Sequence, residues 1–156
     1  MKKALVFTAY NRLRYLQESL FSWDIVRGIE NWHVVFRIEP SDIDHLIAEE
    51  FREFALRNGL TDYEIILNKE KLGVLKHPYI AINELFQQGY DFVVRVEDDI
   101  RVSTDTLEYF EYTAEEYQND QEIAAICTNS YARGGSEEIL RTPKFDPLNW
   151  GTWRDR

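Results

Sequence analysis

Three consecutive carboxylates, Glu97, Asp98 and Asp99, directly follow an apolar run over residues 92–96. The run is built from Phe and Val with one Arg, which predicts a buried strand. Adjacent acids repel one another and fit poorly in a strand, so the strand is expected to end there. Mg²⁺ and Mn²⁺ are commonly held by one or two carboxylates together with phosphate oxygens, and ligands bind at the carboxyl ends of strands in open α/β sheets. The acids are therefore a candidate cation site, or alternatively a solvated turn before a helix, whose N-terminus favours negative charge.

The composition limits the classes of partner. The chain has 156 residues, of which 44% are hydrophobic and 29% charged, and its 18 basic and 28 acidic residues give a net charge of −10. This argues against a broad nucleic-acid or anionic-membrane surface, but it allows a small anionic ligand bridged by a metal ion. The single cysteine excludes an internal disulfide, and no Cys/His spacing indicates zinc. No signal peptide or membrane-length apolar run is evident, which favours a cytoplasmic protein without an integral membrane segment.

Apolar periodicity predicts strands that alternate with helices along a single domain covering residues 1–156. Such an alternation is typical of an α/β fold with a mostly parallel sheet and helices on both faces. Ser41 with Asp44, and Ser103 or Thr104, are expected to cap the second and fourth helices. The expected strands cover residues 4–8, 33–38, 63–67, 92–96 and 123–128, and the expected helices cover 13–23, 43–58, 78–88 and 104–117.

The last part of the sequence has a different character. Residues 129–142 contain Arg133-Gly134-Gly135-Ser136 and few apolar side chains, which predicts a mobile loop. Residues 143–156 are expected to form an irregular tail. Its tryptophans, Trp150 and Trp153, are expected to pack on the domain or on something outside the chain.

Familiar catalytic motifs are absent from the sequence. It contains no GxGxxG, no GxxxxGK[ST] and no GxSxG, and its three histidines lie in unrelated contexts. The polar residues at the predicted strand ends remain. Because the carboxyl ends of parallel strands share one edge, these residues are expected to line one cleft, although each alone could be an exposed charge at a helix start. They are Thr8 to Arg12, Glu39, Asn68 with Gly73 and Lys76, and the three acids.

Two of these segments resemble a known family. Val6–Arg12 is similar to the first strand and nucleotide-contacting loop of GT-A glycosyltransferases, and Val96–Ile100 resembles their Glu-Asp-Asp form of the DxD motif. The likeness is closest to the N-acetylglucosaminyltransferase I type and to bacterial family-2-like relatives. It continues through Leu107–Phe110 and Leu140–Thr142 to Trp150–Gly151 and so covers nearly the whole chain. The resemblance implies a GT-A fold, the Rossmann-like fold of nucleotide-diphospho-sugar transferases.

The resemblance also implies roles for individual residues. Asp99 would ligate Mn²⁺ or Mg²⁺, Asp98 would contact the ribose or the donor sugar, and Glu97 would hold the turn or reach a metal-bound water. Glu39 would accept a hydrogen bond from the uracil or ribose. The remaining nucleotide-sugar contacts would be Thr8, Ala9, Tyr10, Asn11, Arg12 and Lys76.

The implied function is a metal-dependent glycosyltransferase. The metal would assist departure of a nucleoside diphosphate, with a UDP-sugar favoured as donor, while a hydroxyl of a carbohydrate or glycoconjugate acceptor attacks the anomeric carbon. The nature of the sugar, the acceptor, the stereochemical outcome and the oligomeric state are not predicted.

One feature of the family is missing from the sequence. Inverting relatives place a general base beyond the Trp-Gly segment, whereas this sequence ends at Arg156, so the chain is expected to be a minimal or shortened transferase. Glu137 and Asp146 are weak candidates for the base, with Glu138 and Asp155 as further acids within reach. The alternative is a non-catalytic nucleotide-sugar-binding or interaction module. A nucleotidyltransferase would need a basic phosphate loop after the first strand, where only Arg12 and Arg14 are available.

Overall fold

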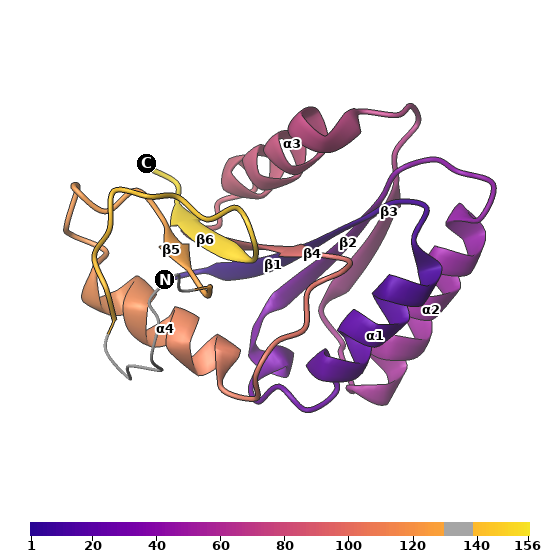
Figure 1. Ribbon diagram of the computed structural model, residues 1–156, viewed down its shortest axis with the longest axis horizontal. Coiled ribbons are helices and arrows are strands. Elements are labelled where there is room, and N and C mark those ends of the chain that lie inside the picture. Colours follow the sequence, from indigo (N-terminus) through magenta and orange to yellow (C-terminus); the bar gives the residue numbers. More distant parts are fainter. Residues whose placement is uncertain (130–138) are drawn as a thin grey trace.

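The computed structural model describes residues 1–129 and 139–156. The predicted loop over residues 129–142, including Arg133-Gly134-Gly135-Ser136, and the candidate bases Glu137 and Glu138 therefore fall mainly or wholly outside the described residues. The strands are β1 (Lys3–Ala9), β2 (His33–Ile38), β3 (Tyr63–Leu67), β4 (Phe92–Glu97), β5 (Ile126–Cys127) and β6 (Trp150–Trp153) (Figure 1). The helices are α1 (Leu13–Trp23), α2 (Asp44–Arg57), α3 (Gly73–Gln87) and α4 (Thr106–Glu116), with a short 3₁₀ helix η1 (Ile29–Asn31).

The strands form one sheet in the order β3-β2-β1-β4-β6-β5. The first four strands are mutually parallel, so their carboxyl ends lie at the same edge, while β6 runs antiparallel to both β4 and β5. The crossover connections between the parallel strands pass through α1, α2 and α3, as expected for a parallel sheet. The predicted α/β architecture with a mostly parallel sheet is confirmed.

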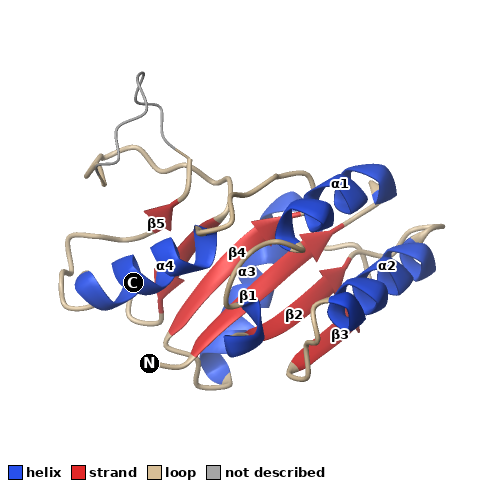
Figure 2. Cartoon of the chain, turned by 90° about the horizontal axis from the view of Figure 1, so that it is seen from below, coloured by secondary structure: helices blue, strands red, loops and turns tan. Residues whose placement is uncertain are grey.

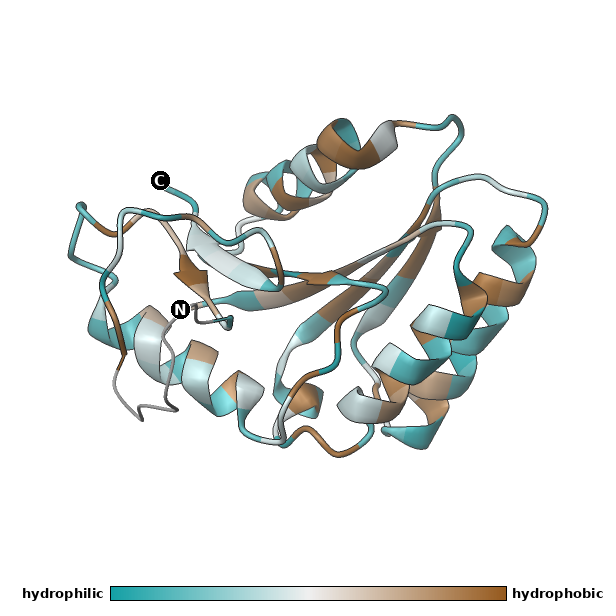
Figure 3. Ribbon diagram, viewed as in Figure 1, coloured by the Kyte–Doolittle hydropathy of each residue, from teal (hydrophilic) through white to brown (hydrophobic). Residues whose placement is uncertain are grey.

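Helices cover both faces of the sheet. α1, α2 and α4 lie on one face and α3 lies alone on the other (Figures 1 and 2). Successive strand residues alternate between these faces, so Phe7 points into the larger core and Val6 into the smaller core under α3. The strands are largely apolar, whereas apolar and polar residues alternate along the helices (Figure 3). No described helix has the length and hydrophobicity that crossing a membrane would require.

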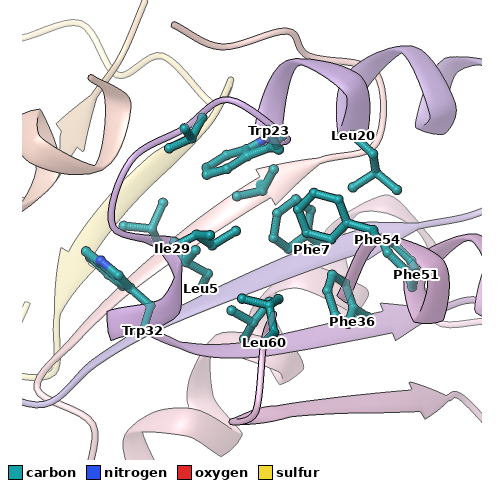
Figure 4. Close-up of a cluster of buried hydrophobic side chains, with 14 of the residues drawn as sticks. Leu5, Phe7, Leu20, Trp23, Ile29, Trp32, Phe36, Phe51, Phe54 and Leu60 are labelled. Carbon is teal, nitrogen blue, oxygen red and sulfur yellow. The ribbon is translucent and has the colours of Figure 1, made fainter. Parts of the chain in front are cut away.

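Aromatic side chains hold the larger core together (Figure 4). Phe36 stacks on Phe51 with ring centroids 4.4 Å apart, and Phe7 meets Trp23 edge-on at 5.2 Å. Phe7, Phe36, Phe51 and Trp23 are buried, and each such side chain contributes about 1.5–3 kcal/mol relative to leaving it exposed. This core fixes α1 and α2 against β1 and β2, and with them the loops that follow these strands.

The predicted irregular tail is wrong for Trp150–Trp153, which form β6 between β4 and β5. Gly151 permits this pairing, because a Cβ atom at that position would lie 2.5 Å from Cζ of Phe92. Trp153 packs edge-on against Phe92 at 5.1 Å and donates from Nε1 to the Ala114 carbonyl at 3.1 Å. The predicted packing of this tryptophan on the domain is confirmed.

Two predicted boundaries are also wrong. The fifth strand is restricted to Ile126–Cys127, and α3 begins at Gly73 instead of at Pro78. The N-cap positions of α2 and α4 are Ile43 and Asp105 instead of Ser41 and Ser103 or Thr104, and neither makes a side-chain cap hydrogen bond. At α2 the Ser41 amide does donate to Asp44 at 3.3 Å, which is one of the two reciprocal bonds of the predicted helix-start pattern.

Candidate functional site

The carboxyl ends of β1, β2 and β4 bring the predicted site residues to one edge of the sheet. Thr8 on β1 pairs with Arg37 on β2 and with Glu97 on β4, so the loops that follow these strands start at the same level. The Thr8 hydroxyl donates to the Val96 carbonyl at 3.3 Å and joins β1 to β4 just below the acids. Ala9 is buried beside it, whereas Asn11 is exposed on the loop.

Arg12 joins the loop after β1 to the acids after β4. Its Nη1 donates to Asp99 Oδ2 at 2.6 Å, and its Nη2 donates to Asp98 Oδ1. The second oxygen of Asp98 accepts a hydrogen bond from the Tyr10 backbone amide at 3.1 Å. Residues that the sequence predicted from two separate segments therefore contact one another directly: Tyr10 and Arg12 after β1, and Asp98 and Asp99 after β4.

The two aspartates differ in exposure. The Asp98 side chain is 2% exposed, whereas that of Asp99 is 30% exposed. Burial raises the pKa of Asp98, and the Tyr10 amide and the Arg12 charge act in the opposite direction. Asp98 is thus an internal anchor of the two loops, and Asp99 is the acid that is more exposed to solvent.

Glu97 is held by residues that lie beyond the predicted site. Its carboxylate forms an ion pair with Arg95 at 2.6 Å, and its backbone amide donates to Asn149 Oδ1 at 2.9 Å. Asn149 is fully buried and adopts a φ of 44°, in the left-handed region where Asn is favoured over most residues. Sequence reasoning missed Asn149, since its partner lies 52 positions away and no motif marks the contact.

Glu39 is placed at the sheet edge as predicted, but its carboxylate is engaged within the chain. It accepts hydrogen bonds from the backbone amides of Leu72 at 2.9 Å and Gly73 at 2.7 Å, at the start of α3. A carboxylate at a helix N-terminus satisfies free amides and complements the helix dipole. The role of Glu39 in binding uracil or ribose stays a prediction.

His77 lies beneath this contact on α3. Its Nδ1 is 3.6 Å from Glu39 Oε1, and its buried Nε2 has no hydrogen-bond partner among the described residues. Burial lowers the pKa of His77 to about 4; the Glu39 charge acts against this shift, and Arg37 and Arg95 reinforce it. His77 is therefore neutral at pH 7 and packs as an uncharged core residue.

Lys71 lies beside the candidate site residue Tyr10 and was not predicted from the sequence, whereas the nucleotide contact of Lys76 stays a prediction. Lys71 Nζ donates to the Tyr10 hydroxyl at 2.8 Å and lies 4.1 Å from the centre of its ring. Lys76 is exposed on α3, and no hydrogen bond or ion pair of its side chain is found among the described residues. Lys71 thus covers the Tyr10 ring, whereas the Arg12 guanidinium lies on Asp98 and Asp99.

Asp146 and Asp155 are accounted for by other contacts. Asp146 is 2% exposed and accepts hydrogen bonds from Asn129 Nδ2 at 2.7 Å and from the Leu148 amide at 3.0 Å. Asp155 follows β6 near Phe92, at the opposite end of β4 from Asp99. Within the described residues the structure thus gives Asp146 a structural role and leaves Asp155 far from the acids.

The acids fit one kind of metal site. Among residues 1–129 and 139–156, no group of three or more His, Cys, Asp or Glu side chains could hold a metal ion. A closed protein cage is therefore not formed by this part of the chain. Asp99 provides one partly exposed carboxylate next to the buried Asp98, which fits a hard divalent cation whose shell is completed by phosphate oxygens.

The largely parallel sheet flanked by helices on both faces defines the class as the GT-A fold of nucleotide-diphospho-sugar transferases. The sequence pattern of the GNT-I family matches residues 70–148, which are 79 of the 156 residues and include the three acids. The chain belongs to the GNT-I family.

Solved structures of low sequence identity share the fold. TarS residues 1–349 from S. aureus, in complex with UDP-GlcNAc, aligns with a TM-score of 0.58 at 23% identity over 76% of this chain and 32% of that one. The mannosyltransferase PcManGT from Pyrobaculum calidifontis, in complex with GDP-Man and Mn²⁺, aligns with a TM-score of 0.58 at 17% identity over 80% of this chain and 34% of that one. A cytidylyltransferase from Leptospira borgpetersenii aligns with a TM-score of 0.55 at 16% identity over 99% of this chain and 61% of that one.

These matches establish the fold and not the reaction. The chain spans about a third of the length of TarS residues 1–349 and of PcManGT. A search of curated protein sequences gave no match.

Proposed function

We propose that the chain binds a nucleoside diphosphate sugar together with a divalent cation and transfers the sugar to an acceptor hydroxyl. The observation that carries the proposal is the contact of Arg12 with Asp98 and Asp99 at adjacent strand ends. It places a cation with a forked, phosphate-binding geometry beside acids suited to Mn²⁺ or Mg²⁺. Membership of the GNT-I family supports this assignment.

Each side chain has a distinct task in this proposal. Asp99 would hold the cation, because its carboxylate is the exposed one, and Asp98 would keep the two loops together. Arg12 and Lys71 would face the diphosphate, and the ring of Tyr10, which Lys71 contacts, would flank the base or ribose. When bound, the cation supplies positive charge that stabilises the departing diphosphate.

A UDP-sugar is the proposed donor, and a hydroxyl of a carbohydrate or glycoconjugate is the proposed acceptor. The proposed location remains the cytoplasm. Both the donor and the location extend the sequence-based predictions. Binding measurements test the donor, and locating the protein in cells tests the location.

A second candidate function is a module that binds the nucleotide sugar without transferring it. The observation that favours it is the burial of Asp146, whose two oxygens already accept hydrogen bonds within the chain. A general base must reach the acceptor proton, so Asp146 would have to leave this position to act. A nucleotidyltransferase is less favoured: Arg14, the second basic residue near β1, is 89% exposed and pairs with Glu18 on its own helix.

Thermal unfolding in the presence of UDP-GlcNAc, UDP-glucose and GDP-mannose, each with Mn²⁺ or EDTA, tests the binding step. A ligand at about 100 times its Kd stabilises the native state by about 2.7 kcal/mol. We expect a rise in Tm with a UDP-sugar and Mn²⁺, a smaller rise in EDTA and no metal dependence in Asp99→Asn. Asp155→Asn, at the opposite end of β4, serves as the matched control. Equal shifts with Mn²⁺ and EDTA would contradict the metal site.

Release of UDP and of free or transferred sugar separates the two candidate functions. An enzyme converts the donor with Mn²⁺ and a hydroxyl acceptor, or hydrolyses it slowly in water. A binding module gives the Tm shift but no release of UDP over the same period.

A further inference from the structure

The guanidinium of Arg12 lies on the same acids that the proposed function assigns to the cation. Nη1 is 2.6 Å from Asp99 Oδ2, and Nη2 contacts Asp98 Oδ1. Both terminal nitrogens of the guanidinium thus make charge-assisted hydrogen bonds. Contacts of this kind are the strongest that arginine makes with acidic groups. The chain thus supplies its own counter-ion to this pair of acids.

The backbone of Arg12 is fixed while its side chain has room to move. The Arg12 amide donates to the Tyr10 carbonyl at 2.7 Å, and the Arg12 carbonyl accepts from the Leu16 amide at 3.0 Å in the first turn of α1. The side chain is 47% exposed. A change of rotamer can therefore take the guanidinium off the acids without disturbing β1 or α1.

Asp98 keeps a partner when Arg12 leaves. Its Oδ2 accepts from the Tyr10 amide at 3.1 Å, and that bond belongs to the backbone. A cation bound at Asp99 would stand next to Asp98 and replace the charge of the guanidinium. The cost of uncovering a buried carboxylate would therefore be offset only when another cation arrives.

A divalent cation and the guanidinium cannot both occupy the Asp99 oxygen, because like charges at contact distance repel strongly. A diphosphate changes this balance, since its oxygens accept both arms of the guanidinium and also complete the metal shell. α1 also begins at this point with no acidic residue in its first turn, so its N-terminus adds no repulsion toward phosphate.

We propose that Arg12 is an internal competitor of the cation, which moves from the Asp98–Asp99 pair to the diphosphate when the nucleotide binds. This inference rests on the proposed function. Free Mn²⁺ then binds weakly because it must displace Arg12, and UDP strengthens Mn²⁺ binding by drawing Arg12 away. By linkage, Mn²⁺ strengthens UDP binding by the same factor, and couplings of this kind typically amount to about 5- to 150-fold.

Calorimetric and electron-spin-resonance titrations with Mn²⁺ alone, UDP alone in EDTA, and each ligand in the presence of the other test this coupling. Arg12→Gln removes the competitor. It should bind Mn²⁺ alone about fivefold or more tightly than wild type and UDP alone more weakly, and the mutual enhancement should shrink. Arg12→Lys keeps a charge but loses the fork, so it should fall between the two.

Arg14→Gln is the matched control. It removes the same charge two positions along the chain from Arg12, but the Arg14 side chain contacts Glu18 and not the acids. It should leave all four titrations unchanged, and Asp99→Asn should abolish tight Mn²⁺ binding in the Arg12→Gln background. Melting temperatures of every variant establish that it is folded.

Separate outcomes overturn the inference and the proposed function. If wild type binds UDP and Mn²⁺ cooperatively but Arg12→Gln binds Mn²⁺ alone no better than wild type, Arg12 is not a competitor and the proposed function stands. If wild type binds neither UDP-sugars nor UDP with Mn²⁺, the proposed function fails and the inference fails with it. An equal gain in Mn²⁺ affinity in Arg14→Gln would show an effect of net charge and would also overturn the inference.

Discussion

The Asn149 side chain accepts a hydrogen bond from the Glu97 backbone amide at 2.9 Å and so ties the end of β4 to the residue that precedes β6. The Asn149 carbonyl in turn accepts hydrogen bonds from the Thr128 amide at 3.3 Å and the Thr128 hydroxyl at 3.1 Å. Asn149 therefore connects the end of β4, the residue after β5 and the start of β6. Because Glu97 directly precedes Asp98 and Asp99, this contact fixes where the chain leaves the sheet.

Two substitutions separate the hydrogen bond of Asn149 from its backbone conformation. Asn149→Gly keeps the φ of 44° accessible but loses the bond to Glu97, and we expect it to lower the free energy of unfolding by about 1–3 kcal/mol. Asn149→Ala loses the bond and strains the backbone, so it should cost about 1 kcal/mol more. Urea unfolding measures both, and a loss below about 0.5 kcal/mol in both variants would exclude the anchoring role.

Asp99→Asn should leave the fold intact while removing the dependence of UDP binding on Mn²⁺. The Asp99 carboxylate is partly exposed, and its ion pair with Arg12 lies at the surface, where such pairs contribute about 0–1 kcal/mol. The substitution also relieves repulsion from Asp98. Calorimetry with Mn²⁺ or EDTA and a thermal unfolding curve make the test. A cooperative transition at a much lower temperature than wild type would assign Asp99 a structural role instead.

Glu39→Ala and Glu39→Gln distinguish anchoring of α3 from binding of the nucleotide. Loss of the carboxylate from the Leu72 and Gly73 amides should cost about 1–3 kcal/mol and speed hydrogen exchange in the first turn of α3. Glu39→Gln keeps one acceptor oxygen, so its cost should be smaller. If both variants retain wild-type stability and exchange but bind UDP more weakly, Glu39 is a nucleotide contact and not an anchor.

The parallel part of the fold could be predicted because its signals are local. The limits of β2 and β3 follow directly from runs of Val, Ile, Phe and Tyr between turn residues, and the buried positions of α1 recur at helical spacing. The acids and Arg12 could be predicted to meet, since strand ends in a parallel sheet share one edge.

The failures arise where distant residues decide the structure. β6 is four residues long and contains Gly151, which is unfavourable in a strand on its own but leaves space for the Phe92 ring. α3 begins before Pro78 because Glu39, 33 residues earlier than Leu72, accepts hydrogen bonds from its first amides. No local pattern at residues 72–78 carries that information.

His77 should make stability depend on pH below neutrality. The pKa of His77 is lowered from 6.5 to about 4 by burial, so between these values the unfolded chain binds a proton that the native state does not. The free energy of unfolding therefore falls as the pH is lowered from 6.5 to about 4, by at most about 3 kcal/mol from this residue. The charged groups that face His77 are Glu39, Arg37 and Arg95.

His77→Gln should remove this component, while His45→Gln serves as the matched control because the His45 side chain is 69% exposed on α2. Urea unfolding of wild type and both variants at intervals from pH 7.5 to pH 4.5 gives the three curves. We expect His45→Gln to run parallel to wild type and His77→Gln to lose less stability on acidification, so that its difference from wild type changes with a slope of up to about 1.4 kcal/mol per pH unit. Carboxylates remote from His77 that titrate in the same range affect all three proteins alike and cancel in that difference. If the His77→Gln curve instead runs parallel to wild type throughout, His77 titrates normally in the native state, and its burial beneath Glu39 does not hold it neutral.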